Sequence, residues 1–388
     1  MGNAPKRARR GGERGNRALR IADRVAGIPA ILAVGAVRRL FGRGSRPIPA
    51  HPGVIGLLKA SGIGDAIILS GVVADLRAHF PDAKIVLFSG ENNHAFARLL
   101  DGLDEVVRLP VRRPHEALQL VRARRPDVMI DFGMWPRLEA LLAALSGARW
   151  VAGVRTPGQH RHFAYDAVVE HSTDHEIVNY RNLAAALGVR SASLPGLRAG
   201  ATEPRPLARP YAVLHLWPGG ANAAERSWPP ERWLGLAQAL DRRGYAVVLS
   251  GGPDDIAKTQ AIVDDWTARA LDARAIAGLR AEETIVWLRH ASGVVSVNTG
   301  LMHVAAAVGT PTVALNGPTS GRRWGPLGAH TRCVSSPLVP DGYLNLGWER
   351  DDRYRTCMHA IAEGAVLAAW DELVAGARAP DRLALRCV

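Results

Sequence analysis

Residues 54–90 read VIGLLKASGIGDAIILSGVVADLRAHFPDAKIVLFSG, and they contain the unit from which the fold can be predicted. A short apolar run, Val54–Ala60, is followed by a small loop, an amphipathic stretch over Asp65–Phe80 and a second apolar run that ends at Gly90. Apolar runs of this length indicate buried strands, and the stretch between them has the length of a helix. A strand, a helix and another strand in this order predict a right-handed βαβ unit with parallel strands.

The same alternation continues along the chain, stops once and then starts again. The interruption, Ser193–Pro210, contains four prolines and no periodicity, which indicates a linker. We therefore predict an α/β protein with an N-terminal domain over residues 51–195, a linker over 196–210 and a C-terminal domain over 211–340. Both domains are expected to be Rossmann-like and to face each other across a cleft. Ligands of open α/β sheets bind beyond the carboxyl ends of the strands, so this cleft is the predicted site.

Positive charge is concentrated at the N-terminus. The chain of 388 residues has a formal net charge of +13 at pH 7, and residues 1–50 carry twelve Lys or Arg residues against Glu13 and Asp23. The remainder is nearly neutral, and the overall 47% hydrophobic and 22% charged residues are typical of a soluble globular protein. Up to Arg24 the segment is rich in Arg and Gly without an apolar period, which predicts disorder.

An apolar run with basic flanks, Val25–Val37, follows these residues. Thirteen residues are too few for a transmembrane helix, which needs about 20. The run fits attachment to an anionic membrane surface, or a secretory signal, although no A-x-A cleavage site follows it directly. Nucleic-acid binding loses support because no aromatic residue interleaves the arginines before Phe41. A solvated tail is the remaining interpretation, so residues 1–50 are predicted to be a basic arm, disordered or lying on a membrane surface.

Several classes of site lack their sequence signature. The cysteines Cys333, Cys357 and Cys387 are widely spaced and form neither a disulfide framework nor a CxxC metal motif, which favours a reducing compartment. The pattern Gly62-x-Gly64 lacks the third small residue of a dinucleotide fingerprint, because position 67 is isoleucine. The Gly-Lys-Ser/Thr of a phosphate-binding P-loop is also absent from this loop.

Two loops that follow predicted strands in the second half carry groups suited to a nucleotide. Trp217–Pro230 combines Gly219 and a second glycine with Arg226, which can neutralise a phosphate. An ordinary loop with a surface arginine is the alternative. In Leu249–Asp255, the carboxylate of Asp254 can bind ribose hydroxyls or cap the helix that follows.

A third loop begins where a predicted strand ends at Asn298. Thr299 and Gly300 start a helix whose free N–H groups and dipole form an anion site. His303 lies one turn inside this helix and can contact a diphosphate, or it is a structural histidine. In the first half, Asp65 stands at the start of the helix after the first strand, where a carboxylate would repel a phosphate.

Six segments occur in order along Val54–Ile361: LLKASGIGDAIILSGVVADLRAHFPDAKI, DVMIDFGMWPRLEALLAALSGAR, WPGG…RSWPPERW, LSGGPDD, NTGLMHVAAAVGTPTVALNGPT…RWGP and CMHAI. Their order and spacing resemble glycosyltransferase family 9, whose best-known members are the bacterial ADP-heptose:lipopolysaccharide heptosyltransferases. The resemblance implies a GT-B fold and inverting transfer from a nucleotide-activated sugar, usually without a metal. It also implies that the C-terminal segment, residues 341–388, returns to brace the N-terminal domain.

The resemblance assigns roles to individual residues. Asp65 is the implied general base, which takes the proton of the acceptor hydroxyl as the sugar carbon becomes oxocarbenium-like, with a helix N-cap as its alternative role. The donor and its phosphates are implied to contact Gly219, Arg226, Asp254, Asn298, Thr299, Gly300 and His303. The acceptor is implied to contact Lys59, Gly62, Gly64, Arg137, Arg155 and His175.

Three segments depart from the family pattern. Asn298 stands where many members have an aspartate before Thr-Gly, and LNGP replaces the commoner LFGP. The cysteine-rich segment of many members is here YLNLGWERDDRYRTCM, in which Cys357 is the one cysteine. These departures predict a divergent member whose sugar specificity can differ.

We therefore expect a cytoplasmic glycosyltransferase at the inner face of a bacterial envelope, acting in the synthesis of lipopolysaccharide or a related glycan. Its expected partners are a nucleotide sugar, with ADP-heptose as the leading candidate, an anionic glycolipid acceptor and the inner-membrane surface through the basic arm. No metal cofactor and no nucleic acid are expected. The alternatives are a nucleotide-sugar epimerase of the same fold, a non-catalytic nucleotide-sugar-binding protein and a membrane-tethering adaptor.

Overall fold

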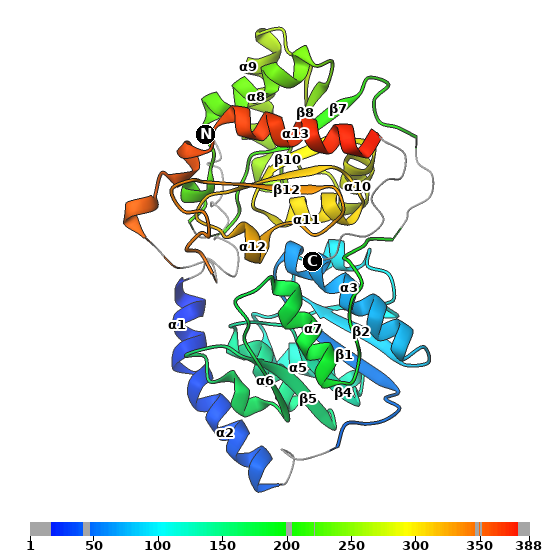
Figure 1. Ribbon diagram of the computed structural model, residues 1–388. Helices are drawn as coiled ribbons and strands as arrows, with labels where there is room; N and C mark the ends of the chain where they lie inside the picture. The colour runs from blue at the N-terminus through cyan, green and yellow to red at the C-terminus, as the bar shows by residue number, and fades with distance from the viewer. Residues whose placement is uncertain are drawn as a thin grey trace, which may run out of the picture.

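Two six-stranded parallel sheets, one in each half of the chain, form the framework of the protein (Figure 1). The computed structural model describes residues 17–41, 47–198, 204–220, 222–345, 349 and 351–378. The strand order is β3-β2-β1-β4-β5-β6 in the first sheet and β12-β11-β10-β7-β8-β9 in the second. This arrangement confirms the predicted α/β fold with two Rossmann-like domains.

The strands are short, as expected for buried parallel sheets. The first sheet contains β1 (Val54–Lys59), β2 (Lys84–Ser89), β3 (Glu105–Arg108), β4 (Val128–Asp131), β5 (Trp150–Arg155) and β6 (Ala167–Glu170). The second contains β7 (Tyr211–His215), β8 (Ala246–Ser250), β9 (Ala273–Ala275), β10 (Gly293–Val297), β11 (Thr312–Asn316) and β12 (Thr331–Ser335). Every residue of β7, β8, β10 and β11 is buried, because helices cover both faces of the sheet.

Helices connect the strands and cover the sheets. Those that begin in the first half are α1 (Arg17–Val25), α2 (Gly27–Leu40), α3 (Ile63–His79), α4 (His94–Ala97), α5 (Pro114–Ala123), α6 (Arg137–Leu145) and α7 (Glu176–Ala186). The second half contains α8 (Pro230–Arg242), α9 (Ile256–Ala268), α10 (Ala281–His290), α11 (Gly300–Ala307), α12 (Gly321–Trp324) and α13 (Glu363–Arg378). Short 3-10 turns are η3 (Arg161–Ala164), η4 (Ala224–Arg226), η5 (Pro253–Asp255), η6 (Asp352–Tyr354) and η7 (Cys357–Ala360).

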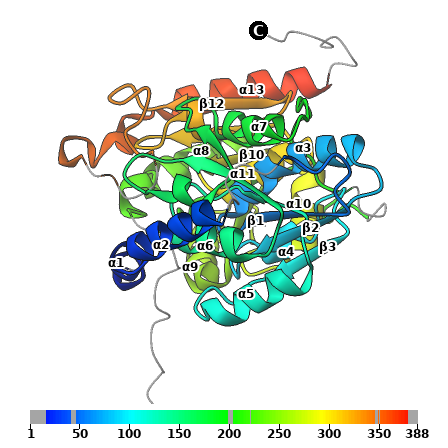
Figure 2. The same cartoon turned by 90° about the horizontal axis from the view of Figure 1, so that it is seen from below.

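The N-terminal arm differs from the prediction of disorder up to Arg24, because α1 and α2 are helical and pack on the first half beside α6 (Figure 2). Ile31 is fully buried in the core against α6 and η3, and a Cβ on Gly35 would lie 2.7 Å from the Phe163 carbonyl oxygen. The close approach of α2 to the domain therefore requires glycine at position 35. The part of the predicted arm over residues 1–16 and 42–46 lies outside the described residues.

The C-terminal helix also differs from the prediction. We expected residues 341–388 to return to the N-terminal domain, but α13 packs on β10, β11, β12 and α8 in the second half (Figure 1). Val366, Trp370, Leu373 and Val374 are spaced along one face of α13 and lie in the core of the second half. An apolar helical stripe of this kind is buried against an apolar face, and the second sheet provides that face.

Candidate functional site

Helices α3 and α11, which belong to different halves of the protein (Figure 1), meet at their N-termini. Each follows a central strand, β1 or β10, so both begin at the carboxyl edge of a sheet. A Cβ on Gly300 would lie 2.7 Å from the Ile63 Cβ, and a Cβ on Gly64 would lie 2.5 Å from the His303 Cδ2. Glycine at both positions therefore permits the contact. Two helix N-termini in one place provide unsatisfied N–H groups and positive potential for an anion.

Asp65 is buried next to this contact, in the first turn of α3. Its Oδ1 lies 3.5 Å from the Lys59 Nζ at the end of β1 and accepts a hydrogen bond of 3.3 Å from the Tyr180 hydroxyl of α7. The Asp65 carboxylate lies over Gly62, where a Cβ would overlap Oδ2 and where φ is +85°. Since α3 begins at Ile63, the N-cap residue is Gly62, and the predicted N-cap role of Asp65 is wrong.

A buried ion pair joins the two halves beside Asp65, and the sequence alone did not reveal it. Arg323 of α12 donates to Glu176 Oε2 at 2.8 Å, and Asn179 donates to the same oxygen at 3.2 Å. Burial raises the pKa of Glu176 to about 7, Asp65 acts in the same direction, and the positive charge of Arg323 opposes both. Arg323 also donates to the Ser172 carbonyl and to His171 Nε2, both at 3.0 Å, so it binds the segment before α7 as well as α7 itself.

The sequence around Glu176 contains one weak signal for a polar cluster. An acidic residue, Asn179 and Tyr180 follow one another at helical spacing in a segment whose other residues are mostly apolar. A polar face of this kind is ordinarily turned to solvent, so the spacing alone does not show that Glu176 is buried. The partner could not be read from the sequence, since Arg323 lies 147 residues away.

Two histidines complete the interface. Burial lowers the pKa of His303 to about 3, with a further contribution from His175, so the His303 ring is neutral near pH 7. His175 caps α7: its Nδ1 accepts from the Ile177 N–H at 3.2 Å, so its Nε2 donates to the Gly325 carbonyl at 2.9 Å. Both ring nitrogens of His175 therefore bond to the backbone, and one of these bonds crosses between the halves.

The predicted acceptor arginines have internal partners. Arg137, buried at the start of α6, donates to Asp23 Oδ2 of α1 at 2.9 Å and to the Gly158 carbonyl at 3.3 Å. The half-exposed Arg155 lies 3.2 Å from the Glu170 carboxylate. An acceptor role for these two residues stays a prediction.

The predicted donor loops lie at the carboxyl ends of strands in the second half. Arg226 of η4 donates to the Gly219 carbonyl, which keeps the guanidinium over the Pro-Gly-Gly loop. Asp254 is exposed on η5, whereas its neighbour Asp255 accepts from the Gly252 N–H at 2.8 Å. The capping role considered for Asp254 therefore belongs to Asp255.

Asn298 forms a specific amide pair. Its Nδ2 donates to Asn316 Oδ1 at 2.6 Å and to the Trp324 carbonyl at 3.1 Å. A carboxylate at position 298 has no hydrogen to donate, so an aspartate would face two oxygens. The two departures from the family pattern, Asn298 and the Asn316 of LNGP, are thus one paired feature. Next to them, Thr299 is the N-cap residue of α11, and its hydroxyl lies 3.3 Å from that of Ser296.

The part of the chain that the structure describes contains no group of three or more His, Cys, Asp or Glu side chains placed to hold a metal ion. Positive charge near the α3–α11 junction comes from Lys59, which pairs with Asp65, from Arg323, which pairs with Glu176, and from the two helix N-termini. The site is therefore a polar interface built from both halves, with one carboxylate, Asp65, beside the junction of α3 and α11.

Two Rossmann-like domains with a polar interface at the carboxyl ends of their strands define the GT-B class of glycosyltransferase folds. The solved structure of E. coli ADP-heptose lps heptosyltransferase II has a TM-score of 0.67 with 21% sequence identity, and the match covers 84% of this chain and 99% of that one. The structure of E. coli heptosyltransferase WaaC with ADP has a TM-score of 0.64 with 18% sequence identity, and the match covers 82% of this chain and 99% of that one. These likenesses confirm the predicted fold.

The chain belongs to glycosyltransferase family 9 (heptosyltransferase), whose family model matches residues 139–341. Lipooligosaccharide heptosyltransferase 2 of Haemophilus influenzae is 31% identical over 119 residues, which are 30% of this chain and 34% of that protein. The chain thus matches about a third of the length of such curated relatives. The family prediction made from the ordered motifs is confirmed.

Proposed function

We propose that this protein is an inverting glycosyltransferase that moves a sugar from a nucleoside diphosphate sugar to an anionic envelope glycolipid. Membership of the heptosyltransferase family supports a heptose donor, and the solved WaaC neighbour is named as a complex with ADP. ADP-heptose is therefore the leading donor, and a lipopolysaccharide-type molecule is the leading acceptor. This function places the protein at the cytoplasmic face of the inner membrane.

The observation that carries the proposal is the buried carboxylate of Asp65 beside two converging helix N-termini. Direct displacement at the sugar carbon needs a base on the acceptor side and positive potential on the side of the leaving diphosphate. Asp65 lies on the first half, and Gly300 begins the helix on the second half that faces it. The Lys59 ammonium at 3.5 Å offsets the charge of Asp65, and the Tyr180 hydroxyl holds one of its oxygens.

The reaction then follows from these positions. Asp65 takes the proton of the acceptor hydroxyl while that oxygen forms the new bond to the sugar carbon. The bond from this carbon to the diphosphate breaks, and the diphosphate leaves with the electron pair. The N–H groups of Thr299 and Gly300 and the guanidinium of Arg226 stabilise the charge on the leaving group. His303 is neutral, so its part in this scheme is a hydrogen bond and not a positive charge.

The experiment that tests the proposal separates donor binding from transfer. Wild type and Asp65→Asn are titrated with ADP-heptose by calorimetry and then assayed with a heptose-deficient lipopolysaccharide acceptor, whose mass is followed. We expect similar donor affinity for both proteins, addition of one sugar by the wild type, and a kcat about 10²–10⁴-fold lower for the variant. Asp254→Asn should instead weaken donor affinity, as expected for a donor-side carboxylate.

Two results would contradict the proposal. Asp65→Asn with undiminished turnover would remove the base assignment. A folded wild-type protein that binds no nucleotide sugar from a panel of nucleoside diphosphate sugars would remove the transferase function itself.

A further inference from the structure

Helices α1 and α2 present an apolar stripe to solvent. Ala26, between them, has helical backbone angles of φ −89° and ψ −34°, so the two form a nearly continuous helix. Positions spaced by three or four residues along this helix lie on one side of it. The side that faces outward consists of exposed residues, here called the outer stripe: Ile21, Val25, Pro29, Leu32, Ala36 and Leu40.

The outer stripe is unusual for a helix on the surface of a protein. A surface helix normally turns polar residues outward, and a helix that is apolar on every side is normally buried. Between Arg24 and Arg38 the chain has no charged or polar side chain, and Ile31 on the opposite side is fully buried. On the outer stripe, by contrast, Val25 is 68% exposed and Leu40 is 83% exposed.

The helix pair is firmly joined to the first half. Arg38 donates to Asp166 at 2.5 Å and to the Ala144 carbonyl at 3.0 Å, and both of its partners belong to the domain. At the other end, Asp23 of α1 accepts from the Arg137 side chain and from its backbone N–H at 2.8 Å. The outer stripe is therefore held in place on the domain that carries Asp65.

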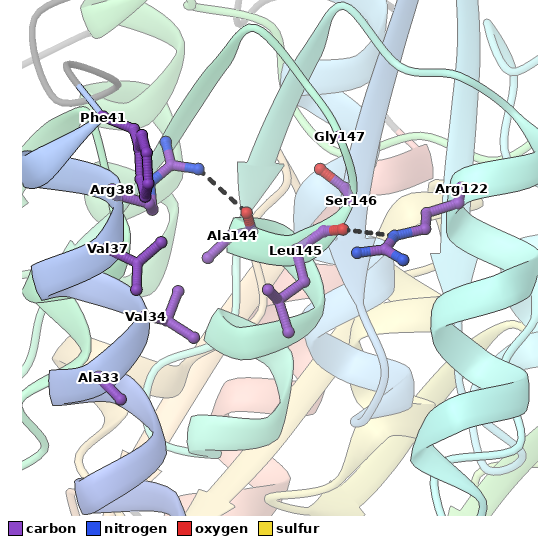
Figure 3. Close-up of a pocket in the computed structure, with 10 residues that line it drawn as sticks. All are labelled: Ala33, Val34, Val37, Arg38, Phe41, Arg122, Ala144, Leu145, Ser146 and Gly147. Atoms are coloured by element: carbon purple, nitrogen blue, oxygen red, sulfur yellow. Dashed lines mark hydrogen bonds between the residues drawn. The ribbon is translucent and has the colours of Figure 1, made fainter.

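A groove extends the apolar surface from α2 to the end of α6. It has a volume of about 730 Å³ and is lined mainly by apolar side chains (Figure 3). Val34 and Val37 point from α2 toward Leu145, which is 36% exposed, and Phe41, 75% exposed, stands at one end. The cations at the groove, Arg38 and Arg122, donate to carbonyls at the end of α6, which leaves an apolar strip between them.

Charge indicates what covers this surface. Exposed Arg24 and Arg39 lie at the two ends of the apolar run, and the sequence continues the positive charge beyond both, from Lys6 to Arg14 and at Arg43 and Arg46. The stripe from Ile21 to Leu40 is about 30 Å long at 1.5 Å per residue. A stripe of this length fits an extended flat surface, such as a bilayer, better than a compact pocket on a partner protein. An apolar helical face between clusters of arginine is typical of a helix that lies in the interface of an anionic bilayer. Among the described helices none combines the length and apolar composition needed to cross a bilayer.

We propose that the outer stripe of α1 and α2, with the groove beside it, docks the protein on an anionic lipid bilayer. The helix lies flat in the bilayer interface, with Val25, Leu32 and Leu40 among the acyl chains and the arginines on the headgroup phosphates. This inference goes beyond the proposed transfer reaction, because bilayer binding needs neither donor nor acceptor.

The test is sedimentation of the 388-residue chain with vesicles of phosphatidylcholine, with and without phosphatidylglycerol, in the absence of nucleotide sugar. The test variant is Val25→Asp combined with Leu40→Asp, both on the outer stripe. The control variant is Leu194→Asp combined with Leu338→Asp, at 57% and 54% exposure outside the helix pair. Circular dichroism melting of all three proteins verifies that each is folded, and light scattering without vesicles gives their masses.

The wild type and the control are expected to sediment with the phosphatidylglycerol vesicles, less so at high salt, and to remain in solution with phosphatidylcholine alone. The test variant should bind at least about tenfold more weakly, because it loses two apolar side chains from the bilayer. Wild-type protein that stays in solution with both kinds of vesicle would overturn the proposal, as would a test variant that sediments like wild type. A wild-type dimer that the test variant converts to a monomer would instead assign the stripe to a second copy of the chain and also overturn it.

Discussion

Replacing Glu176 by glutamine tests how protonation of the interface carboxyl group affects stability. Burial raises the pKa of Glu176 to about 7, compared with its usual value of 4.5. The folded protein therefore holds this proton more tightly than the unfolded chain does. The resulting stabilisation is complete below pH 4.5 and is lost as the pH rises through 7. At about 1.4 kcal/mol for each pH unit between these values, the loss amounts to about 3 kcal/mol.

The assay is the free energy of unfolding, measured by denaturant titration at a series of pH values from about 4.5 to 8. Glutamine has no titrating proton, so the wild-type value minus the Glu176→Gln value isolates the carboxyl group. Burial lowers the pKa of His303 and His215, and these groups change the stability of both proteins alike. We expect the difference to fall by about 3 kcal/mol as the pH rises, and then to level off.

A matched control uses Glu116 of α5, a carboxyl group on the exposed surface. Glu116→Gln should differ from wild type by less than about 0.5 kcal/mol at every pH. A wild-type minus Glu176→Gln difference that is constant, or that increases with pH, would refute the reasoning. An increase would mean that the ion pair with Arg323 outweighs burial and that the carboxylate form stabilises the fold.

Two further substitutions test contacts at the interface and in the donor domain. Asn298→Asp should destabilise the protein by about 1–3 kcal/mol, because it loses both donated hydrogen bonds and faces Asn316 Oδ1 with a carboxylate. Adding Asn316→Phe should recover part of that loss in a double-mutant cycle of denaturant titrations, and purely additive effects would argue against a coupled pair. Gly64→Ala should weaken donor affinity and lower stability by about 1–3 kcal/mol, because the new Cβ lies 2.5 Å from the His303 ring. Gly376→Ala, at a helical position with open space, should be neutral or slightly stabilising, and equal behaviour of the two alanine variants in unfolding and calorimetry would contradict the close contact.

The alternation of strands and helices could be predicted from the sequence because parallel strands are buried on both faces. Strands such as β1 and β10 are mainly apolar and almost wholly buried, and the loops after them contain small residues. The position of Asp65 could also be predicted, because it depends only on the order of strand, loop and helix. The helix predicted from the sequence begins at Asp65, two residues after the observed start of α3 at Ile63. An N-cap role for Asp65 is consistent only with the later start.

The interface between the halves could not be predicted, because its contacts depend on how the two domains are placed. Glu176 and Arg323 are 147 residues apart, and neither belongs to a local pattern that names the other. The same applies to the His175–Gly325 bond, which spans 150 residues. These contacts arise from tertiary placement, whereas propensity and periodicity report only on neighbours in the chain.

The predictions of a disordered N-terminal arm and of a C-terminal segment on the N-terminal domain are wrong for a related reason. The arginines of the N-terminal arm suggested disorder, but Arg38 is buried because Asp166, 128 residues later, neutralises it. The apolar stripe of α13 predicts that one face of this helix is buried, but it does not identify the sheet on which the face packs. Trp370 settles the matter in the structure, since its ring lies against Gly293 of β10.

The bonds that cross between the halves also limit how such a protein can be recombined. A chimera that takes one half from another family member would inherit either Glu176 or Arg323, but not both. A buried charge without its partner destabilises the folded protein far more than an unpaired charge on the surface does. The exchanged half would therefore need to carry a residue of opposite charge at the matching position, or both positions would need neutral residues. Although the two domains have similar folds, this ion pair means that neither can be exchanged without regard to the residue it contacts in the other.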